Sequence, residues 1–214
     1  MSASNPIQVN PLMRVIANLI SVFLHPIFMP LIGCLMLYTA MPELFAGTKP
    51  KLLTGWLGMI VINTIMFPLI LMLLLKGLGF IKSIYLKDVK ERVIPLIGIM
   101  VFYFWPYLVA KNVHGPLLAQ IFLLGNFWGI VVVFMMTIFF KISMHTSAVG
   151  SLLGLLCVMM LSTQSFFVLP LVLLLAAALL VVWARKSLAA HNNKELFLGC
   201  VVGILAQLAA YWYL

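Results

Sequence analysis

Three short stretches of this sequence combine histidines, carboxylates and cations in an arrangement that suits phosphoryl transfer. The last of them, residues 185–195, places His191 and Glu195 four residues apart, which on a helix puts both side chains on one face. A carboxylate there can accept the Nδ1 proton of the imidazole, fix its tautomer and leave Nε2 free as a nucleophile. Arg185 adds a planar, bidentate donor suited to phosphate.

The other two stretches supply further groups of the same kind. Residues 141–145 contain a cation, a hydroxyl and a second histidine, namely Lys141, Ser143 and His145. Residues 82–92 contain Lys87 and Arg92 just before an apolar segment. In a shared pocket, cations would bind the phosphate oxygens while one histidine attacks phosphorus in line and the other protonates the leaving oxygen. We therefore expect a phosphoryl-transfer site where the three stretches meet.

The composition of the chain indicates what must position these residues. Of 214 residues, 65% are hydrophobic and 8% are charged, and the mean hydropathy is +1.22. A soluble domain carries about 25% charged residues, and a membrane β-barrel alternates apolar and polar residues along short strands. Neither class fits, and we predict an all-α fold, a polytopic transmembrane helical bundle.

Seven apolar segments approach the roughly 20 residues that a helix needs to cross a bilayer. They are residues 15–41, 53–75, 93–110, 117–140, 148–162, 167–184 and 196–214. We expect about six to seven spans in a single integral-membrane domain over residues 1–214, with N-terminal helices at about 15–76. The small-residue pairs Gly150/Gly154 and Gly199/Gly203 predict close helix packing within the monomer.

The number of spans between the polar stretches places all three on one side of the membrane. Two predicted spans separate the first stretch from the second, and two more separate the second from the third, so the chain returns to the same face each time. With seven spans, that face would also carry most of the lysines and arginines, which the positive-inside rule places in the cytoplasm. Cations that bind a substrate are set by chemistry and not by topology, so the orientation stays open. The net charge of +9 is explained by lipid headgroups and anionic substrates before nucleic acid.

The polar stretches resemble the three signatures of the type 2 phosphatidic acid phosphatase (PAP2) superfamily. The third signature, Arg-x5-His-x3-Asp, is similar to Arg185-x5-His191-x3-Glu195. The second, Pro-Ser-Gly-His, is similar to residues 143–145, with methionine in place of glycine, and the first, Lys-x6-Arg-Pro, resembles a looser pattern over residues 87–95. The resemblance implies a PAP2-like core over about residues 82–214 and a divergent bacterial member of the superfamily.

The resemblance also implies a role for each matched residue. His191 would be the nucleophile that forms a phosphohistidine, Glu195 its orienting carboxylate and His145 the acid/base. Phosphate would be held by Lys87, Arg92, Ser143 and Arg185, and Lys141 joins them as a cation of the second stretch. No metal or other cofactor is implied. The expected partners are membrane lipids and a lipid phosphate substrate, such as phosphatidate, phosphatidylglycerol phosphate or undecaprenyl pyrophosphate, in the cell (inner) membrane.

Two other functions fit parts of the pattern. A transporter or lipid-binding protein would place ionisable residues near the bilayer midplane, whereas here the charges gather at one rim, with His25 as the exception. A pseudoenzyme would keep the fold and bind lipid phosphate without hydrolysis. His25 lies between apolar residues and is followed by Pro26 and Pro30, which predicts a helix break, and we place it outside the site. The oligomeric state and the identity of the lipid stay open.

Overall fold

The computed structural model describes residues 10–83, 86 and 90–214. Within this part of the chain, seven helical segments are long and apolar enough to cross a membrane, and no strand is present. The segments are Pro11–Ala40, Pro50–Gly77, Val93–Asn112, Leu117–Phe139, Met144–Thr163, Val168–Ser187 and Asn193–Tyr213. The predicted all-α polytopic bundle is confirmed, with the spans extended by a few residues at several ends.

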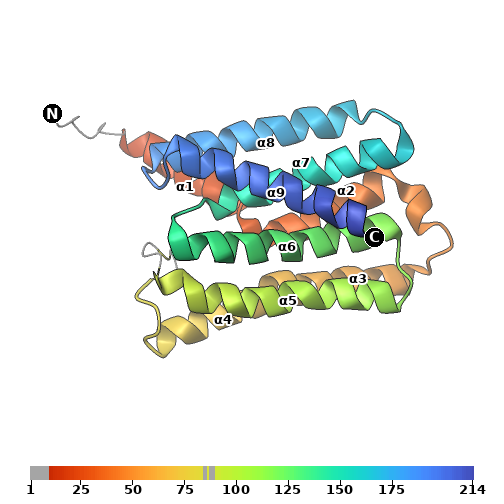
Figure 1. Ribbon diagram of the computed structural model, residues 1–214, viewed down its shortest axis with the longest axis horizontal. Helices are drawn as coiled ribbons and strands as arrows, with labels where there is room; N and C mark the ends of the chain where they lie inside the picture. Colours follow the sequence, from red (N-terminus) through yellow and green to blue (C-terminus); the bar gives the residue numbers. More distant parts are fainter. Residues whose placement is uncertain (1–9, 84–85, 87–89) are drawn as a thin grey trace.

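The first two spans are interrupted, and the other five are continuous helices (Figure 1). The interrupted spans comprise α1 (Pro11–Phe23) with α2 (Met29–Ala40), and α3 (Pro50–Val61) with α4 (Phe67–Gly77). The continuous helices are α5 (Val93–Asn112), α6 (Leu117–Phe139), α7 (Met144–Thr163), α8 (Val168–Ser187) and α9 (Asn193–Tyr213).

Proline chemistry explains the break in the first span. Pro26 has no N–H to continue the hydrogen-bond ladder of α1, which ends at Phe23, and the chain then makes a single 3-10 turn over Pro26–Phe28. His25 stands at the N-terminus of that turn, and its Nδ1 accepts the backbone N–H of Ile27 at 3.3 Å. The histidine side chain thus satisfies a donor that the break leaves without a helical partner.

A different irregularity interrupts the second span. The helix widens into a π-helical turn over Ile62–Met66, directly before the Phe67-Pro68 pair that opens α4. Thr64 and Asn63 in this turn bond back to carbonyls of their own helix, at Ile60 and Met59. The span therefore bends without leaving its backbone exposed to lipid, as a membrane helix must.

The closest helix contact in the bundle joins α7 to α9. A Cβ atom at Gly203 would overlap the carbonyl oxygen of Ser147, and one at Gly150 would overlap the carbonyl oxygen of Cys200. Only glycine lets the two backbones approach this closely. The prediction that these glycines serve packing within the monomer is confirmed. It matters because predicted site residues lie at the start of both helices, Ser143 and His145 at α7 and His191 and Glu195 at α9.

Polar side chains in the interior add a second link between the same helices. Gln207 on α9 is fully buried, and its amide donates to the hydroxyl of Ser151 on α7 at 2.6 Å and to the carbonyl of Phe122 on α6 at 3.2 Å. Ser151 in turn donates to Asn126 on α6 at 3.0 Å. These bonds hold α6, α7 and α9 in one register within the apolar interior.

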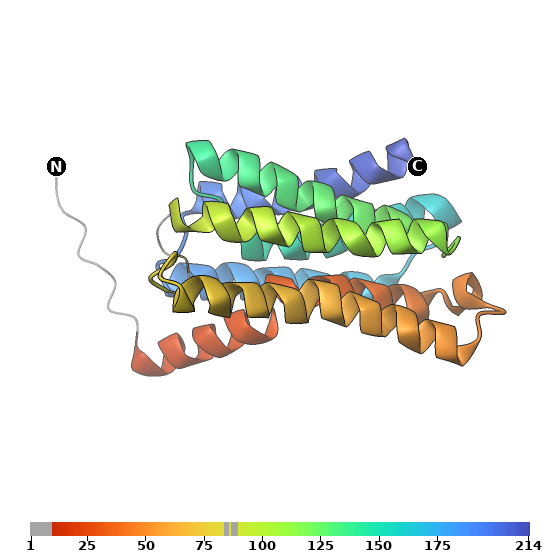
Figure 2. The ribbon, with the colours of Figure 1, turned by 90° about the horizontal axis from the view of Figure 1, so that it is seen from below.

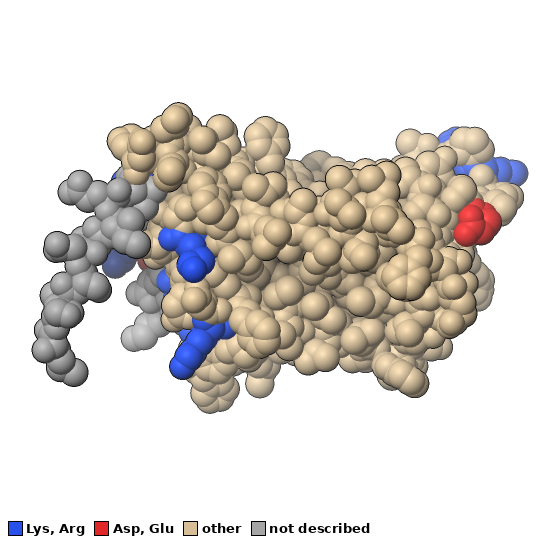
Figure 3. Space-filling model, turned by 90° about the horizontal axis from the view of Figure 1, so that it is seen from above, with Lys and Arg blue, Asp and Glu red and all other residues tan. Residues whose placement is uncertain are grey.

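Charged side chains lie at both ends of the bundle, and an apolar belt separates them (Figure 3). Figure 3 shows lysine and arginine side chains at both ends of one face and uncharged residues between them. Figures 1 and 2 show the α4–α5, α6–α7 and α8–α9 connections at the same end as the start of α1, with the C-terminus at the other. We call the first of these the site end.

Candidate functional site

The site end brings together the described parts of all three polar stretches. His145 lies in the first turn of α7, Arg185 in the last turn of α8, and Glu195 in the first turn of α9. Arg92 directly precedes α5, and Lys141 follows α6. The N-termini of α7 and α9 therefore both point their positive dipole ends toward this region, which favours a bound anion.

His191 and Glu195 form a direct pair, as their spacing predicts. Nδ1 of His191 lies 2.6 Å from Oε2 of Glu195, and 4% of the histidine side chain is exposed. We expected both residues to lie on one face of a helix, and this was wrong for His191. The helix α9 begins at Asn193, and His191 precedes it in the connection. Asn192 caps the helix by accepting the N–H of Glu195 at 2.9 Å and donates to Oε1 of Glu195 at 2.9 Å. The cap thus orients the carboxylate toward the imidazole.

The surroundings of His191 keep its ring neutral. Burial lowers its pKa to about 4, and the positive charges of Lys141 and Arg185 act in the same direction. The hydrogen bond to Glu195 opposes these effects without cancelling them. A neutral ring that donates from Nδ1 to a carboxylate carries its lone pair on Nε2, which is the state that a nucleophilic imidazole requires.

Two cations tie the separate stretches together through backbone carbonyls. Arg92 is 5% exposed, and its guanidinium donates to the carbonyl of Leu86 at 2.9 Å and to that of Ile142 at 3.4 Å. Lys141 Nζ donates to the carbonyl of Ala190 at 2.6 Å, next to His191. Burial lowers the pKa of Arg92. The negative charge of Glu195 acts in the opposite direction, because this carboxylate lies within electrostatic reach of the guanidinium.

The guanidinium of Arg185 has fewer hydrogen-bond partners among the described residues than that of Arg92. The Arg185 guanidinium lies 3.5 Å from the hydroxyl oxygen of Ser21, and its Nε is buried without a hydrogen-bond partner among the described residues. The charges of Arg185 and Arg92 lie close enough to repel each other. Buried donors and neighbouring cations of this kind are costly unless an anion is present to accept and neutralise them.

Ser143 and Lys87 complete the set of predicted phosphate-binding residues. Ser143 is fully buried, its Oγ accepts the N–H of Thr146 at 3.4 Å as the cap of α7, and its own N–H donates to the carbonyl of Glu195 at 3.3 Å. The structure thus shows Ser143 joining α7 to α9, and contact with phosphate stays a prediction. Lys87 lies outside the described residues.

The N-terminal span brings two residues to His145: Ser21, which the sequence analysis did not single out, and His25, which we placed outside the site. Nε2 of His145 lies 3.2 Å from the carbonyl oxygen of Ser21, and the rings of His145 and His25 meet edge to face with centroids 5.3 Å apart. The ring of His25 thus touches a predicted catalytic histidine, although we placed His25 outside the site. An ionisable residue inside an apolar span is itself a signal of function, and it could have identified His25.

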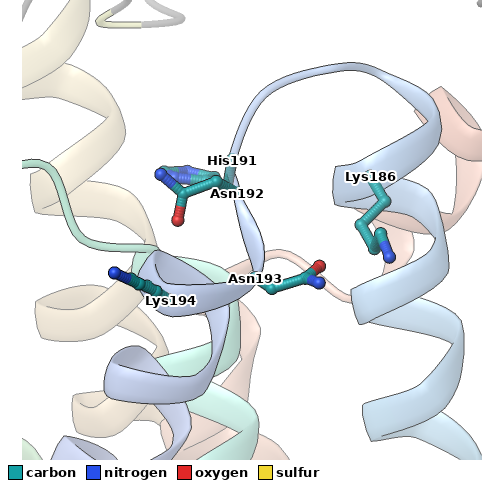
Figure 4. A pocket seen from close by; sticks show the side chains of 5 residues that line it. All are labelled: Lys186, His191, Asn192, Asn193 and Lys194. Carbon is teal, nitrogen blue, oxygen red and sulfur yellow. The ribbon is translucent and has the colours of Figure 1, made fainter.

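An open depression adjoins the site on the outside of the α8–α9 connection. It has a volume of about 630 Å³ and is lined by Lys186, His191, Asn192, Asn193 and Lys194. Figure 4 shows Lys186 on α8 across from the loop that carries His191 and Asn192. The depression reaches the inner cluster at His191, and the two lysines give its rim a positive charge.

The donor set of the site suits an oxyanion better than a metal ion. Among the described residues, no group of three or more histidine, cysteine, aspartate or glutamate side chains is arranged to hold a metal. The charges of Lys141 and Arg185 instead act on His191, and Arg92 lies within electrostatic reach of Glu195. Charge-assisted bonds from such cations are the usual way to bind phosphate.

Comparisons with known proteins do not assign this chain to a family. No protein-family model matches it, no curated protein matches it, and no solved structure matches it. The function must therefore be argued from the geometry of the site and from a multi-pass membrane fold.

Proposed function

We propose that this protein is an integral-membrane lipid phosphate phosphatase or pyrophosphatase of the PAP2 type, which hydrolyses a phosphomonoester or diphosphate of a lipid. The observation that carries the proposal is the His191–Glu195 pair, which lies partly buried at the site end beside Lys141, Arg92 and Arg185. A neutral imidazole with an oriented Nε2 among cations is the arrangement expected for a phosphohistidine enzyme.

The charges at the site support an anionic substrate. Arg92, Lys141 and Arg185 bring three positive charges to one region, and the carboxylate of Glu195 lies within electrostatic reach of Arg92 and His191. A phosphate dianion would accept hydrogen bonds from the unpartnered Nε of Arg185 and relieve its repulsion with Arg92. The site therefore has both the charge and the free donors for phosphate.

The location of the site supports a lipid as the carrier of that phosphate. His145, Arg185 and Glu195 all lie within the terminal turns of helices that are long and apolar enough to span a membrane, which would bring them to the depth of lipid headgroups. A substrate whose tail remains in the bilayer would present its headgroup at this level. We propose the cell (inner) membrane as the location, and a reporter fused after Leu214 would determine the side on which the site lies.

The proposed reaction has two steps. Nε2 of His191 attacks phosphorus, and the bond from phosphorus to the lipid oxygen breaks. The negative charge of the bound phosphate favours the protonated form of His145, which donates its proton to that oxygen. The positive charge that develops on the His191 ring is stabilised by Glu195 through Nδ1–H. Water then attacks phosphorus, gives a proton to His145, and releases inorganic phosphate from Nε2. The net reaction consumes one water and returns both histidines to their starting states.

Phosphate release from a panel of lipids tests the proposal. The purified protein in proteoliposomes is given phosphatidate, phosphatidylglycerol phosphate or undecaprenyl pyrophosphate, and we expect release from at least one of them. His191→Ala and His145→Ala should abolish it. His114→Asn is the matched control, because this histidine lies exposed in the α5–α6 connection with a φ of 52°, which asparagine tolerates.

Two outcomes would contradict the proposal. Activity that survives His191→Ala would eliminate the proposed nucleophile. Binding of a lipid phosphate without release of phosphate would identify a pseudoenzyme that keeps the anion pocket without turnover.

A further inference from the structure

One face of α1 is turned toward the site although the helix lies outside the three polar stretches. Ala17 and Ser21 are the buried residues of α1, one helical turn apart, and α1 packs against α8. His25 follows one turn later, where the helix breaks. Ala17, Ser21 and His25 thus follow one another at intervals of one helical turn, and the last of them, His25, touches His145.

The carbonyl of Ser21 fixes the tautomer of His145. A carbonyl oxygen can only accept a hydrogen bond, so the 3.2 Å contact requires that Nε2 of His145 carry the hydrogen. Proton exchange with substrate and water then takes place at Nδ1. The carboxylate of Glu195 acts on His191 in the equivalent way through the opposite ring nitrogen.

Ser21 also contacts the arginine of the site. Its hydroxyl oxygen accepts from Arg185 at 3.5 Å, while it donates to the carbonyl of Ala17 at 2.8 Å within α1. One residue therefore touches the predicted acid/base through its backbone and a predicted phosphate ligand through its side chain.

His25 also contacts the His145 ring. The two rings are nearly perpendicular, at 85°, in the edge-to-face arrangement that aromatic pairs prefer. The orientation of His25 is itself fixed, because its Nδ1 accepts the N–H of Ile27 at the helix break. The break at Pro26 is thus what turns His25 toward α7.

From these contacts we infer that the end of α1 and the break after it form a wall of the site, with Ser21 and His25 as positioning residues for His145 and Arg185. The inference rests on the proposed function and adds a segment of the chain to it. His25 acts through His145 and does not touch the substrate.

Paired substitutions at His25 test the inference. We expect His25→Ala to lower kcat about tenfold, the upper end of what an edge-to-face ring pair contributes, with little change in KM. His25→Phe keeps a ring that can pack against His145 and should restore most of kcat. A melting temperature close to that of wild type in both variants separates this effect from general unfolding, and His114→Asn is the control for loss of a histidine elsewhere.

A second measurement does not depend on catalysis. Diethyl pyrocarbonate modifies accessible, unprotonated imidazoles, and mass spectrometry reports the rate at His145. The rate should rise in His25→Ala and return toward wild type in His25→Phe. An unchanged rate at His145 in His25→Ala would overturn the inference whether or not the protein releases phosphate, and so would a loss confined to KM. If the wild type released no phosphate, the proposed function would be rejected. A raised labelling rate in His25→Ala would still support the role of His25 as a positioning residue for His145.

Discussion

Replacement of Glu195 by glutamine provides the sharpest test of the site chemistry. The carboxylate lies 2.6 Å from Nδ1 of His191, and positive charge develops on this ring when Nε2 bonds to phosphorus. A hydrogen bond to a charged group contributes about 1.5–3 kcal/mol, and a factor of ten in rate corresponds to about 1.4 kcal/mol. We therefore expect kcat of Glu195→Gln to fall about 10- to 150-fold, with KM little changed because Glu195 does not bind phosphate.

The local structure should tolerate this substitution. The helix cap survives, since it joins the Asn192 side chain to the backbone N–H of residue 195 and does not need the carboxylate. Glu195→Asp keeps the negative charge but moves it away from His191 by the length of one methylene. Its kcat should therefore lie between those of wild type and Glu195→Gln. The assay is phosphate release over a range of lipid concentrations, together with acid-quench trapping of the phosphoenzyme. A kcat of Glu195→Gln close to wild type, or a loss that appears only in KM, would refute the role of this carboxylate.

Three further predictions concern binding, pH and packing. Arg185→Gln should raise KM about tenfold in the same assay, because it removes a charge-assisted donor to phosphate. The lowered pKa of His191 keeps the ring neutral down to about pH 4, so the loss of kcat/KM caused by its protonation should occur near 4 and not near the ordinary value of 6.5. Gly203→Ala should destabilise the bundle by about 1–3 kcal/mol, read as a lower melting temperature, because the new Cβ would overlap the Ser147 carbonyl oxygen. Gly58→Ala is the control, since a Cβ there meets nothing within 4 Å.

The number of spans, and the end of the bundle at which each connection lies, follow from local properties of the sequence. A bilayer requires about 20 apolar residues per crossing, so hydropathy alone locates the helices. Two crossings between successive polar stretches then place the three stretches at one end, and the structure has residues 90–92, 141–145 and 185–195 there (Figure 1).

The His191–Glu195 contact was also predictable, although for a partly incorrect reason. A separation of four residues brings side chains together on a helix, but here the contact forms across the helix start, because Asn192 caps α9 and His191 remains in the connection. Capping by asparagine is a local signal, and an Asn-x-x-Glu pattern before an apolar run could have identified it.

The place of α1 was decided by the tertiary structure. The sequence shows an ionisable residue next to two prolines, from which a helix break follows, but nothing local tells which helix the histidine faces. The answer depends on α1 packing against α8 and on the break turning His25 toward the first turn of α7. Hydropathy and residue spacing act along one chain segment, whereas the contact of Ser21 with both His145 and Arg185 joins residues far apart in the sequence. Such contacts are set only when the helices pack in the bundle.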